Sequence, residues 1–151
     1  MFVVAAGADR NGRDVGFELW AVDHRTSEVT LLDLRAGQNG SLPLHLAAFR
    51  GELFFSAVGD LNHRGAPAGR ELWRTDGTAA GTVLVKDIEA GPDGSSPDWF
   101  TSISATQLLF CADTEAIGRE LYVTDGTGAG TVLLTEVDST VVTGDANPDD
   151  M

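Results

Sequence analysis

The chain has almost no cysteine or lysine and no long hydrophobic run. Cys111 is the single cysteine and Lys86 the single lysine among 151 residues. One cysteine excludes an intrachain disulfide, and its place in the apolar stretch TQLLFCAD predicts a small buried side chain, not a nucleophile. No apolar stretch is long enough to cross a bilayer. MFVVAAGA at the start lacks the basic lead-in and cleavage site of a secretory signal, so we expect a strand there and no membrane insertion.

Basic residues are scarce as well. The chain carries 23 acidic and 10 basic side chains, a formal charge of −13. Such an excess repels nucleic acid and anionic membrane surfaces, so we expect neither as a partner. The acidic balance could attract divalent cations, but a solvated acidic surface is the simpler interpretation. Hydrophobic residues make up 42%, which predicts a folded core and argues against wholesale disorder.

The usual motifs of metal and hydrolase chemistry are missing. The three histidines, His24, His45 and His63, belong to no HExxH, HxH or Cys/His cluster, so no zinc site is predicted. No GxSxG elbow is present either. Fold alone never excludes an enzyme, but these absences favour a protein without catalytic residues.

The main signal in the chain is an internal repeat. RELWRTDGTAAGTVLV at 70–85 returns as RELYVTDGTGAGTVLL at 119–134, and a degenerate copy lies near the start. Two further registers agree: LLDLRAGQNGSLP (31–43) matches VKDIEAGPDGSSP (85–97), and MFVVAA matches LFFSAV (53–58) and LLFCAD (108–113). The recurring positions are Glu18, Trp20 and Asp23; Glu71, Trp73, Asp76 and Gly77; and Glu120, Tyr122, Asp125 and Gly126. Repeated stretches of this kind indicate a scaffold built from similar units and not a single catalytic constellation.

The registers divide the chain into unit 1 (1–43), unit 2 (44–97) and unit 3 (98–137), followed by an acidic tail (138–151). Each unit reads as up to four short strands separated by turn signals, and unit 1 begins directly with the second of them. Four antiparallel strands in about fifty residues are typical of a β-propeller blade. We therefore expect an all-β, propeller-like fold with about three blades in one module.

The Asp-Gly-Thr segment predicts a turn, not an active site. Asp76 can bind nearby backbone N–H groups, and Gly77 tolerates positive φ. The first copy keeps Asp23 without the glycines, so it needs a differently built turn.

The other repeated residues also have structural interpretations. We expect the three glutamates to accept hydrogen bonds from the backbone or from Arg70 or Arg119; a channel lined by glutamates that collects cations is the alternative. We expect the three aromatic residues to pack between units, with sugar or peptide stacking as the alternative.

One loop has the composition of a calcium site. Asp9, Asn11 and Asp14 lie in DRNGRD, which is rich in oxygen ligands and contains glycine. The loop lacks the spacing and the terminal glutamate of an EF-hand. Asp and Asn also begin turns without any metal, and we favour that interpretation. No other cofactor is predicted.

The segment GRELWRTDGTAAGTVLVKDIEAGPDGSSP (69–97) resembles the repeat of the ELWxxDGT family of bacterial proteins. The resemblance implies a propeller-like or similar all-β repeat fold, implies an extracellular or cell-surface location, and implies no catalytic residues. We therefore expect a non-enzymatic structural or recognition module that binds an unidentified ligand through loops at the blade ends. A calcium-dependent adhesion or structural module is the second hypothesis, and a glycan-active enzyme is the third.

Three blades are too few for a closed ring. Propellers have about four to eight blades, and open blades leave unpaired edges and apolar faces that promote association. We expect two chains to join head to tail into six blades, or further repeats of a longer chain to complete the ring. STVVTG (139–144) could supply the inner strand that unit 1 lacks; a frayed terminus is the alternative.

Overall fold

Strands and turns make up the whole of the described chain. The computed structural model describes residues 1–60 and 68–135, and these contain eleven strands and no helix. The prediction of an all-β, antiparallel chain is confirmed. Within the same two ranges, no helix is long and apolar enough to span a bilayer. His63, the STVVTG segment and the acidic tail lie outside the described residues.

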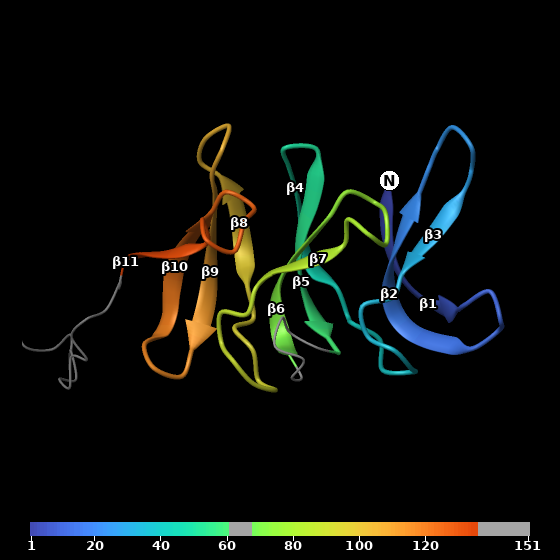
Figure 1. The fold of residues 1–151 in the computed structure, drawn as a ribbon, viewed down its shortest axis with the longest axis horizontal. Helices are drawn as coiled ribbons and strands as arrows, with labels where there is room; N and C mark the ends of the chain where they lie inside the picture. Colours follow the sequence, from blue (N-terminus) through green and yellow to red (C-terminus); the bar gives the residue numbers. More distant parts are fainter. Residues whose placement is uncertain (61–67, 136–151) are drawn as a thin grey trace, which may run out of the picture.

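Each repeat unit forms one antiparallel meander (Figure 1). The first sheet has the order β1 (Phe2–Ala8), β2 (Asp14–Val22), β3 (Val29–Leu32). The second has the order β4 (Leu44–Phe49), β5 (Glu52–Gly59), β6 (Ala68–Thr75), β7 (Val83–Lys86). The third has the order β8 (Asp98–Ser102), β9 (Leu108–Thr114), β10 (Gly118–Thr124), β11 (Val132–Thr135). Unit 1 has no strand before β1, as its sequence predicts.

The strand registers give the three units a common frame. Trp20 lies opposite Val3 and Leu31, and Trp73 lies opposite Phe55 and Leu84 in the same way. In unit 3, Tyr122 occupies this position and lies opposite Phe110 and Leu133. Residues of different units can therefore be compared position by position.

The sheets stand in a row, with unit 2 between units 1 and 3, and they do not close into a barrel (Figure 1). Each sheet has two faces. We call the face that is turned toward the unit 1 end of the row its N-side face, and the face that is turned toward the unit 3 end its C-side face. Neighbouring side chains of a strand point to opposite faces, so each strand of unit 2 contributes to both interfaces. Strand β5 is accordingly buried at nearly every position, whereas β1 at the end of the row contains only half-buried and exposed residues.

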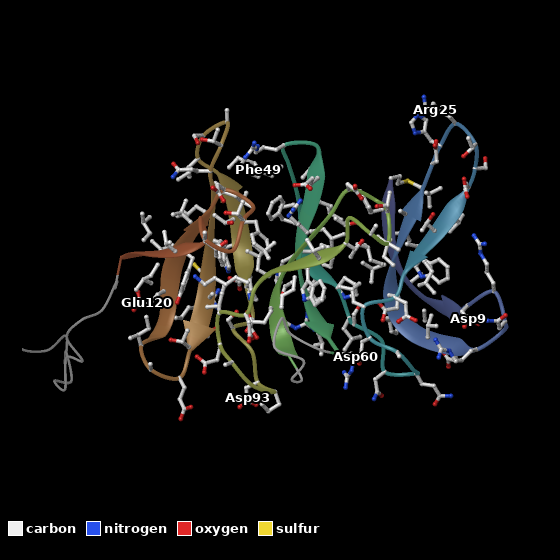
Figure 2. The ribbon with its side chains drawn as sticks, in the orientation of Figure 1. Asp9, Arg25, Phe49, Asp60, Asp93 and Glu120 are labelled. Atoms are coloured by element: carbon white, nitrogen blue, oxygen red, sulfur yellow. The ribbon has the colours of Figure 1, made fainter. Side chains whose placement is uncertain are left out.

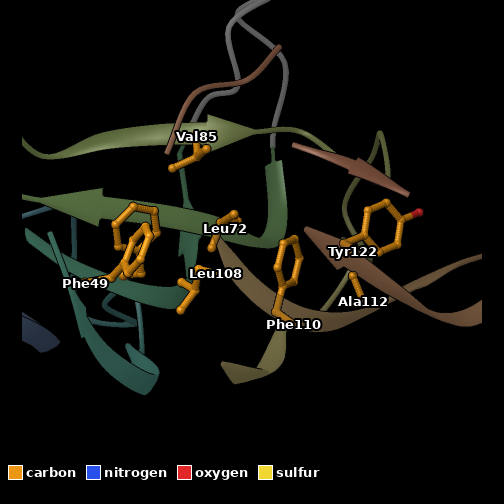
Figure 3. Close-up of a cluster of buried hydrophobic side chains, with 8 residues drawn as sticks. Phe49, Leu72, Val85, Leu108, Phe110, Ala112 and Tyr122 are labelled. Atoms are coloured by element: carbon orange, nitrogen blue, oxygen red, sulfur yellow. The ribbon is translucent and has the colours of Figure 1, made fainter. Parts of the chain in front are cut away.

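The hydrophobic core consists of two clusters, one in each space between sheets. In the first cluster, Leu19 and Leu32 of unit 1 contact Phe55 and Trp73 of unit 2. The second cluster, between units 2 and 3, has the same plan. It contains Phe49, Phe54, Leu72 and Val85 from unit 2 and Leu108, Phe110, Ala112 and Tyr122 from unit 3 (Figure 3). The burial of apolar side chains is the main favourable contribution to folding. In this chain that burial occurs between sheets, so each unit depends on a neighbouring unit for its stability.

Candidate functional site: the repeated interface between sheets

The turn formed by Asp-Gly-Thr has the same hydrogen bonds in units 2 and 3. Oδ1 of Asp76 accepts bonds from the backbone N–H and the hydroxyl of Thr78, at 2.8 and 2.7 Å. The same hydroxyl accepts the N–H of Gly81 at 2.9 Å. Asp125 binds Thr127 at the same two distances. These bonds, led by the threonine hydroxyl, lower the pKa of both carboxyls.

Each of these turns packs on the preceding sheet. Gly77 has φ of +96°, and a Cβ there would lie 3.7 Å from the ring of Phe2 in unit 1. Gly126 has φ of +95°, and a Cβ there would lie 3.2 Å from the ring of Phe54 in unit 2. The positive φ favours glycine at both positions. The close approach of Phe54 adds a steric reason at Gly126, whereas a Cβ on Gly77 would make an ordinary contact with Phe2. Lys86 of unit 2 also donates to the carbonyl of Thr131, at 2.6 Å, beyond the turn of unit 3.

Unit 1 has a different turn at the corresponding place. Oδ1 of Asp23 accepts the N–H of Arg25 at 2.8 Å, and the N–H of Asp23 donates to the carbonyl of Glu28 at 2.9 Å. The turn therefore keeps an aspartate that binds its own backbone but lacks the threonine contacts of units 2 and 3. Figure 2 shows Arg25 at one end of the strands and Asp9 at the other.

The tryptophans of the repeat lie against glycines of the neighbouring strand. Nε1 of Trp20 donates to the carbonyl of Ala5, and Nε1 of Trp73 to that of Ala57, both at 3.1 Å. A Cβ on Gly59 would lie 2.4 Å from the indole of Trp73, so only glycine leaves room for this ring. Trp73 is 8% exposed in the first core cluster, whereas Trp20 at the end of the row is half-buried.

Tyr122 takes the tryptophan position in unit 3. Its ring stacks on Phe110 with centroids 5.6 Å apart, and burial raises the pKa of its hydroxyl. Thr114 of β9 lies where unit 2 has Gly59, so unit 3 combines a ring smaller than indole with a residue larger than glycine.

The three repeated glutamates are buried, and Glu18 and Glu71 bind the linkers between units. The carboxylate of Glu71 accepts four hydrogen bonds: from the N–H and hydroxyl of Ser95, at 2.9 and 2.5 Å, and from the N–H groups of Ile88 and Glu89, at 3.0 and 3.1 Å. Burial nevertheless raises the pKa of Glu71 from 4.5 to about 7, because removal from water penalises the charged form more than the donors favour it.

Glu18 repeats this arrangement in unit 1. It accepts the N–H of Ser41 at 2.7 Å, the hydroxyl of the same serine, and the N–H of Leu34 at 3.5 Å. Burial again raises its pKa. Glu120 is 3% exposed in unit 3. The arginines named as alternative partners bind elsewhere: Arg70 donates to the carbonyls of Leu42 and Ser56, and Arg119 pairs with Asp98 and Asp113.

The two serines also connect each linker to the following sheet. The carbonyl of Ser41 accepts the N–H of Val58 at 2.9 Å, and the carbonyl of Ser95 accepts the N–H of Asp113 at 2.7 Å. A glutamate of one unit therefore positions a serine that is hydrogen-bonded to the next unit. Sequence reasoning did not identify these serines, although both lie in the repeated linker register (31–43 and 85–97).

The loop with calcium-like composition uses its oxygens internally. Oδ1 of Asp9 accepts the N–H groups of Asn11 and Arg13, both at 2.9 Å, and the bond from Arg13 is the main cause of the lowered pKa of Asp9. Asp14 accepts the N–H of Gly16 at 2.9 Å. Among residues 1–60 and 68–135, no group of three or more His, Cys, Asp or Glu side chains could hold a metal ion. Calcium binding stays a prediction.

An acidic pocket of about 320 Å³ lies at the junction of units 2 and 3, and four carboxylates line it. Two of them already have partners: Glu89 accepts the N–H of Glu115 at 3.1 Å, and Asp113 accepts a bond from Arg119 at 3.0 Å. Asp93 and Glu115 supply the other two carboxylates. Figure 2 shows Asp93 and Asp60 at the same end of the strands.

The edge strands β4 and β8 share an irregularity at their bulges. His45 and Trp99 have φ of 54° and 56° where the register shifts. This left-handed conformation is uncommon for residues other than glycine. Trp99 is 77% exposed, unlike the aromatic residues of the repeat, so it is available for stacking against a ligand.

No family model, no curated protein and no solved structure matches this chain.

Proposed function

We propose that the chain is a non-catalytic repeat module, a scaffold and recognition unit of an exported bacterial protein, in which propeller-like sheets stack through one repeated interface. The observation that carries this proposal is the equivalence of the two interfaces. Gly77 lies against the ring of Phe2, and Gly126 lies against the ring of Phe54 at the equivalent position. The serine of each linker also accepts a hydrogen bond from the following sheet in the same way.

The repeated residues support a structural role because most of their polar atoms have structural partners. Asp76 and Asp125 bind their own turns, Glu18 and Glu71 bind linkers, and Trp73 binds a strand carbonyl. A catalytic carboxylate needs access to a substrate, whereas Glu71 is fully buried. The resemblance of residues 69–97 to the ELWxxDGT repeats supports export.

Recognition would use exposed groups at the strand ends and bulges, since loops carry binding sites on rigid scaffolds. Trp99 is an exposed aromatic residue on the edge strand β8. Replacement of Trp99 by alanine should abolish binding in a screen of polysaccharides and peptides without changing the melting temperature. A replacement at Ile103, which is exposed in the neighbouring turn, serves as the control and should leave binding unchanged.

A glycan-active enzyme is the competing hypothesis. Its carboxylates would have to be accessible, so the acidic pocket is where we test for catalytic residues. The protein is incubated with soluble polysaccharides and chromogenic glycosides, and released reducing ends are measured. We expect no turnover. Turnover that is lost in both Asp93→Asn and Glu115→Gln, with the fold intact, would overturn the proposed function.

A further inference from the structure

The two ends of the row carry apolar faces that correspond to the buried faces inside it. The open N-side face belongs to unit 1 and comprises Met1, Val3, Ala5, Trp20 and Leu31. The open C-side face belongs to unit 3 and comprises Leu109, Cys111, Leu121 and Leu134. These residues occupy the positions that form the two core clusters between units.

Side chains on the open N-side face of unit 1 are more exposed than the equivalent side chains of units 2 and 3. Val3 is 39% exposed, whereas Phe55 and Phe110 at the same position of units 2 and 3 are 0% exposed. Met1 is 71% exposed, against 8% for Leu53, which occupies its place in unit 2. The difference arises because units 2 and 3 each have a preceding sheet against this face.

Side chains on the open C-side face of unit 3 are likewise more exposed than the equivalent side chains of units 1 and 2. Leu134 is 52% exposed, whereas Val85 and Leu32 at the same position of units 2 and 1 are 5% and 2% exposed. Leu121 is half-buried where Leu72 and Leu19 are fully buried. Apolar side chains at these positions are therefore buried wherever a following sheet is present.

We propose that a second copy of this chain places its open N-side face on the open C-side face of the first, continuing the interface between units across the two chains. Both internal interfaces join a C-side face to an N-side face, so the two ends are complementary to each other and not to themselves. The contact is therefore head to tail. This inference rests on the proposed function, because it uses the same repeated interface.

Two such contacts can close two chains into a ring of six sheets, a number within the range of about four to eight blades found in propellers. The acidic charge opposes this association, since each copy carries −13. Added salt screens that repulsion and should strengthen the complex, whereas it would weaken a complex held by opposite charges.

The test uses one charged substitution on each face. Val3→Asp disrupts only the open N-side face, and Leu134→Asp disrupts only the open C-side face. Sedimentation velocity at micromolar concentration should give twice the chain mass for the parent protein. Each variant should be a monomer, with association weakened by more than ~100-fold, because an unpaired carboxylate would be buried. Ile103→Asp, at a turn residue with 50% exposure, is the matched control and should still associate.

Mixing the two variants tests the direction of docking. Val3→Asp keeps an intact C-side face and Leu134→Asp an intact N-side face, so an equimolar mixture should form a one-to-one dimer through the single remaining contact. Melting temperature and near-UV circular dichroism must match the parent protein. If either variant fails to fold, Val29→Asp and Val132→Asp, each at a 46% exposed position, replace it on the same faces.

A parent protein that stays monomeric would overturn the docking proposal, and so would association that survives both substitutions. Dimers of Val3→Asp alone would also contradict it, because they would show that unit 3 pairs with unit 3. These outcomes leave the scaffold function standing for a single chain. Turnover in the glycan assay would overturn that function without affecting the mass measurement.

Discussion

Glu71 binds Ser95 through both oxygens, accepting the serine N–H at 2.9 Å on one and the hydroxyl at 2.5 Å on the other. The carbonyl of that serine in turn accepts the N–H of Asp113 in the next sheet. A buried carboxylate thereby positions the linker between two units. Four predictions about the repeat follow from this geometry and from the neighbouring turns and glycines.

Replacing Glu71 by alanine should lower the free energy of unfolding by about 3–5 kcal/mol. The change leaves four donors without their acceptor and creates a cavity, and both effects are costly in a buried site. Chemical denaturation measures the loss. Glu28→Ala, at an exposed turn residue, is the control and should change stability by less than about 0.5 kcal/mol. A similar small effect for Glu71→Ala would refute the structural role of this carboxylate.

Glu71 should also make stability depend on pH. Its pKa is raised from 4.5 to about 7 in the folded state, so between these values the folded protein binds more protons than the unfolded chain. The contribution of this group is therefore fully present below pH 4.5 and declines as pH rises to about 7, by about 3 kcal/mol in total. Denaturation across this range, compared with Glu71→Gln, isolates the effect. A difference in the opposite direction would contradict the assignment.

Gly81→Ala should destabilise the turn that begins at Asp76. The added Cβ would lie 2.1 Å from Oδ1 of Asp76, so the carboxylate must move and lose its bonds to Thr78. We expect a loss of about 1–3 kcal/mol by thermal denaturation, as for other overpacked sites. In an Asp76→Ala background the same substitution should cost less, because the clashing group is absent. Gly130→Ala should repeat the effect in unit 3, where the clash with Asp125 is the same.

Gly59→Ala should displace the indole of Trp73, whose ring lies 2.4 Å from the position of the new Cβ. Because this ring is in the first core cluster, the expected loss is about 1–3 kcal/mol. The tryptophan emission should shift to longer wavelength as the ring becomes exposed. Gly7→Ala beside the half-buried Trp20 is the comparison and should cost less, because a Cβ there would be 2.9 Å from the ring.

The strands could be predicted from the sequence because their signals are local. Turn residues bound each apolar stretch, and three registers of the repeat give the same boundaries to within a few residues. Some strands extend into polar segments: Asp14, which belongs to the turn-like DRNGRD sequence, begins β2, and Asp113 at the end of the LLFCAD register lies within β9. Its backbone donates to Ser95 and its carboxylate pairs with Arg119, so contacts from other segments extend the strand.

The interface could be predicted only in outline. The repeated aromatics and glutamates indicate structural positions, but Glu71 and its partner Ser95 are 24 residues apart, and no local pattern connects them. The closeness of Trp73 to Gly59 likewise depends on the register of β5 and β6. The angle between neighbouring sheets depends on side-chain packing that periodicity does not specify.

The hydrogen bond from Asp113 to Ser95 joins the linker of unit 2 to the sheet of unit 3, and the bond from Val58 to Ser41 joins the linker of unit 1 to the sheet of unit 2. Each bond therefore connects adjacent units only. Melting of a terminal sheet therefore deprives the middle sheet of a partner and leaves the far end untouched. The chain would lose its order from the outside inward, and the amides of the central sheet would be the last to exchange with solvent.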